Sequence, residues 1–421
     1  MNYMKVLIIS HNVFSRTDSM GKTLSSYFAD FSQDELAQFY IHAQVPTTNL
    51  CNKYFRMTDK DAIKSIIGIG RGRSFEEKDI DYDRVDSRTD TGFTGIIYQK
   101  ARRRTPLVYL ARNLWWKLAH WDTKSFKRWV DNFQPECVFL ASGDYAFIYD
   151  IAYAIAKSRN IPLYVSCMDD YYLYNKNGNN VLGRLQHLFF MKSVNRTMEY
   201  STKLFCICDK MSEDYRKLFH KKCVTVHTSA TIHKPLKLER KHQISYLGNL
   251  GYNRDKQLVD IGRTLKALNL TPNHIDVYST ESRPEILSGL TEENGIVFHG
   301  AIGANEVLKV MGESLAVIHT ESFEENIRNS VRYSVSTKIA DSLISGTCIF
   351  AYGPEEVASI DYLNKNKAAI CCTDKKELGE ALVKLIEDFS YRSEIENNAV
   401  KLAYVNHINM TEGIIRNSLE K

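Results

Sequence analysis

The sequence predicts an α/β protein of two domains, each built on a doubly wound parallel sheet. Short apolar runs of strand length alternate with amphipathic stretches along the chain, as expected for strands joined by helical crossovers. The alternation pauses over residues 229–242 and then restarts. A chain of 421 residues also suits two cores of moderate size better than one.

In the first half of the chain, four runs rich in β-branched or aromatic residues indicate buried strands. They are residues 5–10, 136–142, 162–168 and 203–208, and the helical candidates between them are residues 21–31, 145–157 and 181–200. Residues 62–104 are polar and charged with little periodicity, so we interpret them as a long insertion. We place this first domain at residues 1–235.

Residues 229–242 are polar and basic and contain Pro235, which is typical of a linker between domains. Six further strand candidates follow, namely QISYLG, HIDVYS, GIVFHG, LAVIHT, GTCIFAY and KAAICCT. The second domain is therefore predicted to span residues 236–395. The last stretch, residues 396–421, is predicted to be helical and to pack back across the domains.

Composition limits the function classes. The net charge is +5, from 55 basic and 50 acidic residues, which is too mild to indicate a nucleic-acid binder. The nine cysteines are scattered, several of them in apolar runs, so we expect buried, reduced thiols and a reducing compartment. The apolar start is too short for a signal peptide and no run has the length of a membrane span, so we expect a cytoplasmic protein.

The loop after the first predicted strand contains Gly21, at the start of a predicted helix. A glycine there lets a phosphate approach the backbone N–H groups at the positive end of the helix. The fragment Gly21-Lys22-Thr23 is not a P-loop, because the glycine required five residues earlier is Arg16. The alternative is an ordinary helix N-terminus, and both remain open at this point.

Acidic residues offer two kinds of candidate. Asp79, Asp81 and Asp83 form overlapping D-x-D patterns, but they lie in a charged stretch rather than at a strand end, so we interpret them as a solvated loop and expect no metal site. Asp169 directly follows a predicted parallel strand, where ligands of such sheets bind, and Asp144 has a similar place. The alternative for both is a helix N-cap.

A basic and aromatic segment covers residues 100–129. It contains Arg102, Arg103 and Arg104, and all four tryptophans of the chain, including Trp115 and Trp116. Cationic side chains pair with anionic headgroups and indole rings favour the membrane interface, so we predict membrane contact here. The alternative is a helix that faces the core with a solvated basic side.

Two loops of the second domain carry the strongest signal. The first, within ISYLGNLGYNRDK, is a strand, a turn with Gly248 and a helix start with Arg254 and Lys256. The second precedes a helix that opens near Ser336, Thr337 and Lys338. Hydroxyl groups, cations and free helix N–H groups predict a cradle for a diphosphate, with Asp341 one turn further on, within reach of a ribose.

These two motifs resemble those of GT-B glycosyltransferases of family 4 (group 1), of the bacterial polysaccharide-biosynthesis type. Members carry a glycine plus a basic pair after the first strand of the second domain, matched here by Arg254 and Lys256. They also carry a pattern of the form P-S-K-x-x-E-Y-L-A-x-G, which STKIADSLISG resembles through Lys338 and Asp341. The paired glutamates of the family would need a Glu at Tyr333, so Glu321, Glu324 or Glu325, from a longer loop, is a candidate replacement.

The resemblance implies two Rossmann-like domains facing across a cleft, with a nucleotide-sugar, UDP-linked, on the C-terminal domain. It implies transfer of the sugar with retention. The basic and aromatic segment at residues 100–129 adds the expectation of a membrane-associated, lipid-linked saccharide acceptor at the inner face of the cell membrane. Arg254 and Lys256 would neutralise the leaving phosphate in place of a metal ion, no cofactor would be needed, and Asp169 would orient or deprotonate the acceptor.

Two alternatives remain open beside a transferase. Nucleotide-sugar 2-epimerases share this architecture, which would make the chain an isomerase. A non-catalytic nucleotide-sugar-binding partner of another transferase is the second. Transfer that depends on an added acceptor distinguishes a transferase from both.

Overall fold

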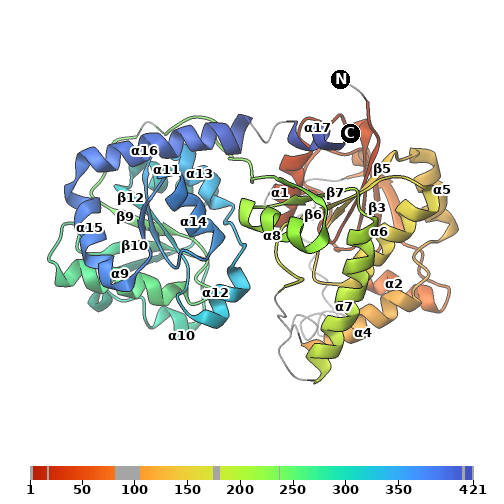
Figure 1. Ribbon diagram of the computed structural model, residues 1–421, viewed down its shortest axis with the longest axis horizontal. Helices are drawn as coiled ribbons and strands as arrows, with labels where there is room; N and C mark the ends of the chain where they lie inside the picture. Colours follow the sequence, from red (N-terminus) through yellow and green to blue (C-terminus); the bar gives the residue numbers. More distant parts are fainter. Residues whose placement is uncertain are drawn as a thin grey trace. The chain divides into compact units, whose positions relative to one another are not determined.

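The computed structural model describes residues 3–16, 19–80, 105–173, 181–236, 238–409 and 413–419. The chain forms two compact units, one of Met1–Val226 with Glu412–Lys421 and one of His227–Thr411. Each unit is a mainly parallel sheet flanked by helices (Figure 1). The predicted pair of doubly wound α/β domains is therefore confirmed.

The described part of the first unit forms an eight-stranded sheet in the order β4-β3-β2-β1-β5-β6-β7-β8. Neighbouring strands pair in parallel, except for β3 and β4, which are antiparallel. The strands are β1 (Val6–Ser10), β2 (Leu36–Tyr40), β3 (Lys53–Arg56), β4 (Arg73–Glu76), β5 (Cys137–Ala141), β6 (Leu163–Cys167), β7 (Lys203–Cys206) and β8 (Lys222–Thr225). The helices are α1 (Ser19–Tyr27), α2 (Asp59–Ile66), α4 (Pro106–Leu118), α5 (Lys124–Phe133), α6 (Ala146–Arg159), α7 (Val181–Tyr200), α8 (Asp209–Phe219) and α17 (Ile414–Leu419).

The second unit has a six-stranded parallel sheet in the order β11-β10-β9-β12-β13-β14. All six predicted strands form: β9 (Ile244–Leu247), β10 (Ile275–Tyr278), β11 (Ile296–Gly300), β12 (Ala316–Thr320), β13 (Cys348–Tyr352) and β14 (Ile370–Cys372). The helices are α9 (Arg254–Ala267), α10 (Pro284–Leu287), α11 (Ala304–Glu313), α12 (Glu325–Val331), α13 (Lys338–Ser345), α14 (Ala358–Lys365), α15 (Leu378–Glu387) and α16 (Phe389–Ala403).

The boundary between the units differs from the predicted one at residue 235. It lies at residue 226, because the following segment bonds to the second unit. Ala230 N donates to His407 O at 3.0 Å, and Leu236 N donates to Ser345 O at 2.9 Å. The C-terminal helices also divide, with α16 in the second unit and α17 in the first.

The predicted insertion at residues 62–104 begins as ordered structure. Helix α2 continues to Ile66, and β4 pairs with β3 so that the rings of Tyr54 and Phe75 stack at 5.3 Å. Nothing in the sequence indicates this strand, because β4 is a short edge strand whose exposed residues give no apolar period. Residues 81–104 lie outside the described residues.

Helices form where apolar side chains recur at helical spacing. Helix α5 is N-capped by Thr123, whose hydroxyl accepts from Phe126 N at 3.2 Å, and C-capped by Gln134, which has a left-handed backbone. Its buried residues are Phe126, Val130 and Phe133, which share one face.

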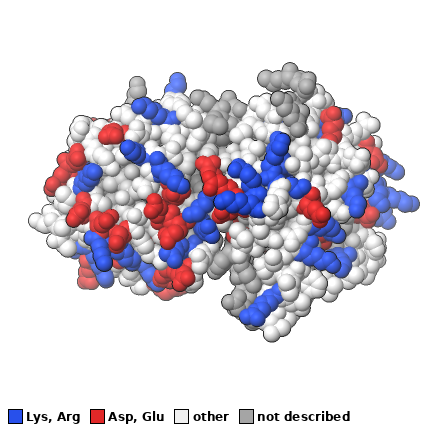
Figure 2. Space-filling model, in the orientation of Figure 1, with Lys and Arg blue, Asp and Glu red and all other residues white. Residues whose placement is uncertain are grey.

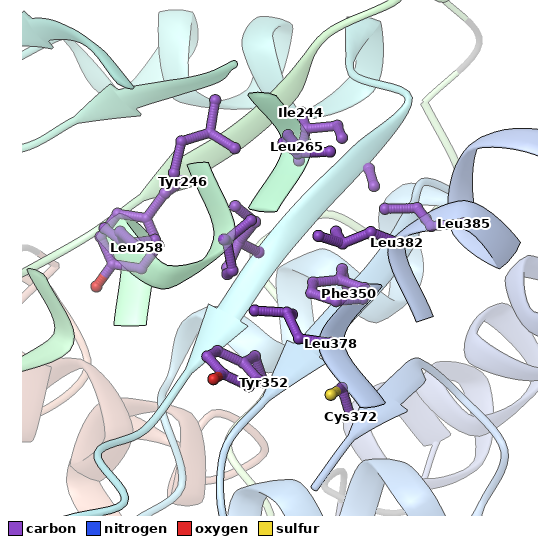
Figure 3. Close-up of a cluster of buried hydrophobic side chains, with 14 of the residues drawn as sticks. Ile244, Tyr246, Leu258, Leu265, Phe350, Tyr352, Cys372, Leu378, Leu382 and Leu385 are labelled. Atoms are coloured by element: carbon purple, nitrogen blue, oxygen red, sulfur yellow. The ribbon is translucent and has the colours of Figure 1, made fainter. Parts of the chain in front are cut away.

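The core of the second unit holds the β9–α9 loop in place. Buried side chains of β9 and α9, such as Tyr246 and Leu258, lie side by side, and Phe350 lies near Leu382 from α15 (Figure 3). Because protein cores are close-packed, the first turn of α9 has a defined position relative to the end of β9. All nine cysteines are free. Among the described residues, no helix combines the length and apolar character needed to span a membrane.

Candidate functional site

The second sheet has its topological switch point between β9 and β12. From β9 the chain proceeds through β10 to β11 on one side, whereas β12 lies on the other side of β9 and continues to β13 and β14. Loops that leave two such strands diverge and open a crevice at their carboxyl ends, where ligands of doubly wound sheets bind. Gly248 begins the loop after β9, and Glu321 begins the loop after β12.

An ion pair joins these two loops. Arg254, the first residue of α9, donates from Nη2 to Glu321 Oε1 at 2.8 Å and Oε2 at 3.0 Å, and from Nε to Thr320 O at 3.2 Å. Glu321 is only 1% exposed, so burial raises its pKa while the guanidinium lowers it. The contacts fix the guanidinium at the carboxyl end of β12.

The turn that leads into α9 is backbone-strained. Tyr252 and Asn253 are consecutive non-glycine residues with φ of 61° and 57°. Such conformations cost about 1–3 kcal/mol each and persist where the surroundings impose them. The turn brings Arg254 to the first position of the helix, with its guanidinium carbon 5.5 Å from the centre of the Tyr252 ring.

Lys338 approaches the same point from α13. Its Nζ donates to Leu247 O, at the end of β9, at 2.7 Å. Loss of hydration and the charge of Arg254 lower the pKa of Lys338 to about 8. A side chain at Gly248 would place its Cβ 3.2 Å from Lys338 Nζ and 2.9 Å from the Tyr246 hydroxyl, so the glycine leaves room for the ammonium group.

Ser336 and Thr337 lie just before α13, as predicted. The Ser336 hydroxyl accepts from Lys338 N at 3.4 Å, and Thr337 is the N-cap residue. The first turn of α13 therefore faces the end of β9, to which Lys338 is bonded. The N-termini of α9 and α13 both present backbone N–H groups and partial positive charge, which favours an anion.

A histidine that sequence reasoning missed lies beside the ion pair. His319, within β12, has its Nε2 2.9 Å from Ser359 Oγ and 3.9 Å from Glu321 Oε1. Burial, and then the charge of Arg254, lower the pKa of His319 to about 3, so the ring is neutral near pH 7. The signal in the sequence is a histidine inside an otherwise apolar strand, LAVIHT.

Two of the predicted donor residues have other partners. Lys256 is exposed and pairs with Glu324 at 2.7 Å. Asp341 accepts hydrogen bonds from the backbone N–H and, at 2.9 Å, from the hydroxyl of Thr231, so it fastens the segment that precedes β9 to α13. Lys256 and Asp341 therefore take no part in the hydrogen bonds that join Arg254 to Glu321 and Lys338 to Leu247.

Gly21 has a packing role in the first unit. A Cβ at this position would lie 2.5 Å from Val13 O and 2.7 Å from Ser15 Cβ. The close approach of α1 to the loop after β1 therefore requires a glycine, whether or not a phosphate binds there.

The first sheet has its own switch point, between β1 and β5. His11 follows β1, and its Nε2 lies 2.9 Å from Arg112 Nη2, while Arg112 Nε donates to Asp59 Oδ1 at 2.9 Å. The guanidinium carbon of Arg112 lies 3.9 Å from the ring centre of Tyr145, which follows β5. Burial, followed by the charge of Arg112, lowers the pKa of His11 to about 4.

Aromatic rings extend this cluster of side chains. Tyr145 stacks on Tyr109 at 4.7 Å, and the Tyr109 hydroxyl donates to Asp144 Oδ2 at 2.5 Å. The sequence singled out Asp144 but missed His11, Arg112 and Tyr145. Their joint position depends on α2, whose Asp59 holds Arg112 of α4 although the two residues are far apart in the sequence.

The predicted membrane role of Trp116 is wrong. The indole is 1% exposed, stacks on Phe147 at 4.5 Å and donates from Nε1 to Asp59 Oδ1 at 2.7 Å. It is part of the core, because α4 turns this side toward α2 and α6. Trp115 is half-buried. Arg102, Arg103 and Arg104 lie outside the described residues.

Of the acidic candidates, Asp169 follows β6 and accepts from Asp170 N at 2.9 Å. Asp170 is buried and accepts from the Tyr215 hydroxyl at 2.8 Å, so it holds the turn. Asp79 accepts from Glu76 N at 3.0 Å, whereas Asp81 and Asp83 are outside the described residues. Within the described ranges, no group of three or more His, Cys, Asp or Glu side chains is arranged to hold a metal ion.

The chain matches no protein-family model, and no curated protein matches its sequence. Solved structures do match. Anabaena HepE in complex with UDP has a TM-score of 0.63 and 10% identity, covering 99% of this chain and 100% of that chain. The fold is GT-B. Trehalose 6-phosphate synthase from Burkholderia multivorans has a TM-score of 0.60 at 10% identity over 100% of this chain and 97% of its own.

A third GT-B structure is WaaG, a glycosyltransferase involved in lipopolysaccharide biosynthesis. It has a TM-score of 0.57 at 11% identity and covers 99% of this chain and 98% of that chain. At these identities the likeness establishes the GT-B fold of the chain.

Proposed function

We propose that this chain is a glycosyltransferase that moves a hexose from a UDP-sugar to a membrane-associated, lipid-linked saccharide acceptor. The observation that carries the proposal is the convergence of Arg254, Lys338 and the N-termini of α9 and α13 at the switch point of the second sheet. Two cations and two sets of helix N–H groups at one crevice suit a diphosphate.

The proposed chemistry uses charge stabilisation. When the bond from the anomeric carbon to the diphosphate oxygen breaks, negative charge develops on the leaving phosphate. Preorganised cations beside that oxygen stabilise the transition state more than the ground state. Glu321 holds Arg254 in place, and a guanidinium has five N–H donors, so it can bind a carboxylate and a phosphate together.

We propose that these cations take the place of a metal ion and that no cofactor takes part. Lys256 would stabilise charge from further out, since its partner Glu324 is exposed and easily exchanged for a phosphate. Transfer should therefore continue in EDTA. Loss of activity in EDTA, with rescue by Mn²⁺ or Mg²⁺, would contradict this part of the proposal.

The first unit would bind the acceptor. Its crevice combines the rings of Tyr109 and Tyr145 with the polar groups of Asp144, His11 and Arg112. Aromatic walls with a few placed polar groups are typical of small-molecule sites and suit a sugar ring. Asp169, at the end of β6, remains our candidate for orienting the acceptor hydroxyl.

The finer assignments rest on resemblance. The STKIADSLISG motif supports family 4 and, with it, retention of the anomeric configuration. UDP is supported by the HepE complexes, which contain UDP, UDP with glucose, or UDP-glucose. A role in cell-surface polysaccharide biosynthesis and a peripheral location at the inner face of the membrane are supported by the likeness to WaaG.

A thermal-shift screen of the purified protein against nucleotide sugars tests the donor. Binding at a concentration 100 times Kd should add about 2.7 kcal/mol of stability. UDP-sugars should raise the melting temperature, and Arg254→Ala should remove the shift. A shift with another nucleotide but not with UDP would contradict the UDP assignment.

Transfer is then measured with a labelled UDP-sugar and a lipid extract as acceptor, with and without the extract. Label should move to the lipid phase only when the extract is present. Conversion of the donor without acceptor would indicate an isomerase, and binding without turnover would indicate a non-catalytic partner.

A further inference from the structure

Large hydrophobic side chains are exposed mainly on one part of the first unit. Among the residues that the structure describes, thirteen of the twenty exposed large hydrophobic residues lie within residues 63–69, 107–118 and 173–189. These ranges cover α2 with the loop after it, α4 and the first half of α7. They also include Leu173, which precedes α7. Single exposed hydrophobic residues are normal, but a cluster of them marks an interaction site. This concentration therefore indicates a binding partner.

The three helices are neighbours. Helix α4 contacts both α2 and α7, and the three lie together at one end of the first unit (Figure 1). On α4, Leu107, Leu114 and Leu118 are 55–64% exposed and share one helical face, while Arg112 and Trp116 point inward. The outward side of α4 is therefore apolar.

Helix α7 repeats the arrangement. Val181, Leu185 and Leu188, spaced four and three residues apart, are 82%, 43% and 64% exposed. Gly183 and Phe190 are buried on the inner side. An amphipathic helix normally buries its apolar stripe, but this one also presents a second stripe to solvent.

The loop after α2 presents two exposed isoleucine side chains. Ile67 and Ile69 are 71% and 68% exposed. Between and after them, Gly68 has a φ of 78°, and a Cβ at Gly70 would lie 2.1 Å from Asp61 O. The two glycines hold the backbone against α2, so that both isoleucines project outward.

The charges around this surface are mainly positive, and the two carboxylates in the first turn of α2 have partners, since Asp59 pairs with Arg112 and Asp61 accepts from the Thr58 hydroxyl. Residues 62–75, 105–121 and 181–198 contain no Asp or Glu, in a chain with 50 of them. The exposed charged residues there include Lys64, Arg71, Lys117, Arg184 and Lys192. On the face shown in Figure 2, the described surface at this end of the first unit is white and blue.

We propose that this face, formed by α2 with its following loop, α4 and α7, docks on an anionic lipid membrane. The exposed Ile and Leu side chains would enter the boundary between headgroups and acyl chains, and the basic residues would pair with the headgroups. A second copy fits poorly, because a two-fold interface would set the same positive charges against each other. The inference deepens the membrane part of the proposed function, with residues other than Trp116.

Co-sedimentation of the full-length protein with vesicles tests the proposal. Vesicles of phosphatidylcholine, with or without phosphatidylglycerol, are used at low and at high salt. The protein should sediment with the anionic vesicles at low salt, and binding should weaken as salt rises. Replacing Ile67 and Ile69 together by Ser should lower the partition coefficient by about tenfold or more, as expected for two apolar side chains removed from lipid.

A matched control changes exposed hydrophobic residues of the second unit. Leu268→Ser with Phe389→Ser, at positions 42% and 72% exposed, should leave vesicle binding unchanged. Lys64→Gln with Arg71→Gln should reduce binding to anionic vesicles about 25-fold at low salt, since each basic residue near such a surface is worth about fivefold. The melting temperature of each variant shows that it is folded.

Three results would overturn the proposal. They are a parent protein that stays in the supernatant with anionic vesicles at low salt, an isoleucine variant that sediments like the parent, and self-association of the parent that the isoleucine changes abolish. The last would assign the face to a second copy. UDP binding by the isoleucine variant is measured in parallel, so failure of the donor site and failure of this surface are told apart.

Discussion

At the carboxyl edge of each sheet an arginine pairs with a carboxylate beside a histidine, but the groups around the two ion pairs differ. In the first unit, Arg112 pairs with Asp59 beside His11, at the end of β1. In the second, Arg254 pairs with Glu321 beside His319, near the end of β12. In both, burial and the neighbouring guanidinium lower the histidine pKa, to about 4 and about 3, so that the ring stays neutral.

The surroundings separate the two crevices. Tyr109 and Tyr145 stack beside the first ion pair, whereas Lys338 and two helix N-termini lie near the second. The doubly wound topology makes a crevice in each unit, but it does not decide what binds there. Aromatic surface suits a sugar, and cations with helix N–H groups suit a diphosphate, which is why we propose the acceptor for the first unit and the donor for the second.

The largest expected effect is that of Arg254→Ala. Turnover with a UDP-sugar should fall by about 100- to 1,000-fold, the range for loss of one preorganised donor to a developing negative charge. UDP affinity, measured by calorimetry, should fall as well. The melting temperature should also fall, because the change leaves the buried Glu321 without its cation.

Glu321→Gln is the control for that variant. It keeps the shape of the side chain and the Arg254 cation, so UDP affinity should stay within a few-fold of the parent. If both variants lose UDP affinity equally, the ion pair only maintains structure and the second crevice is not a donor site.

The Tyr145→Leu variant tests whether the acceptor and the donor bind in different units. Losing one aromatic contact is worth about 0.5–1.5 kcal/mol, so the acceptor KM should rise by up to about tenfold. UDP affinity should remain within twofold of the parent. An equal loss in UDP affinity would remove the assignment of acceptor and donor to different crevices.

The charge of Lys338 makes UDP binding depend on pH. The pKa of Lys338 is lowered to about 8, so in the free protein the ammonium loses its proton between pH 7 and pH 9. The cation favours the diphosphate, and UDP affinity should therefore fall by about tenfold over this range, in line with the protonated fraction. Lys338→Arg, which keeps its charge, should give a flat profile, and a parent profile equally flat would exclude a role for this charge.

The smallest expected effect concerns stability in acid. The pKa values of His11 and His319 are below the ordinary value of 6.5, so the unfolded chain takes up protons first as pH falls. Stability is present above pH 6.5 and is lost toward pH 4. His319→Asn should reduce the loss of melting temperature between pH 7 and pH 4.5 by several degrees, at roughly 2–4 °C per kcal/mol. A parent whose melting temperature does not change over this range would contradict the neutral state of these rings.

The sequence predicted the second sheet better than the first. Its six strands are apolar runs with polar or glycine boundaries, whereas β2, β3, β4 and β8 of the first unit were not predicted. In β2 the apolar run is broken by Gln38, which is fully buried because its amide donates to Ser10 Oγ at 2.9 Å and to Asn12 O at 3.2 Å. In a sequence pattern a glutamine predicts an exposed position, because the hydrogen-bond partners that allow its burial are far away in the chain.

The candidate site was predicted in part. Gly248, Arg254 and Lys338 lie together as glycine and basic residues at a strand end and two helix starts, a pattern that the sequence contains. Asp341 was assigned to a ribose from its spacing in the helix, but its carboxylate bonds to Thr231, 110 residues earlier. Spacing along a helix predicts the face of a residue, but not what packs on that face.

By itself, the sequence determined the alternation of strands and helices, the division into two α/β units, and the cations and glycine that follow the strands of the second unit. These features are local, since a strand or a helix start is specified by a few adjacent residues. The tertiary structure alone decided which carboxylates hold the arginines, because Arg254 and Glu321 are 67 residues apart and Arg112 and Asp59 are 53 apart. It also decided that α4 buries Trp116 and exposes Leu107, Leu114 and Leu118. Helix α4 has apolar residues on several sides, so the sequence does not determine which side is buried, and the packing of the neighbouring elements does.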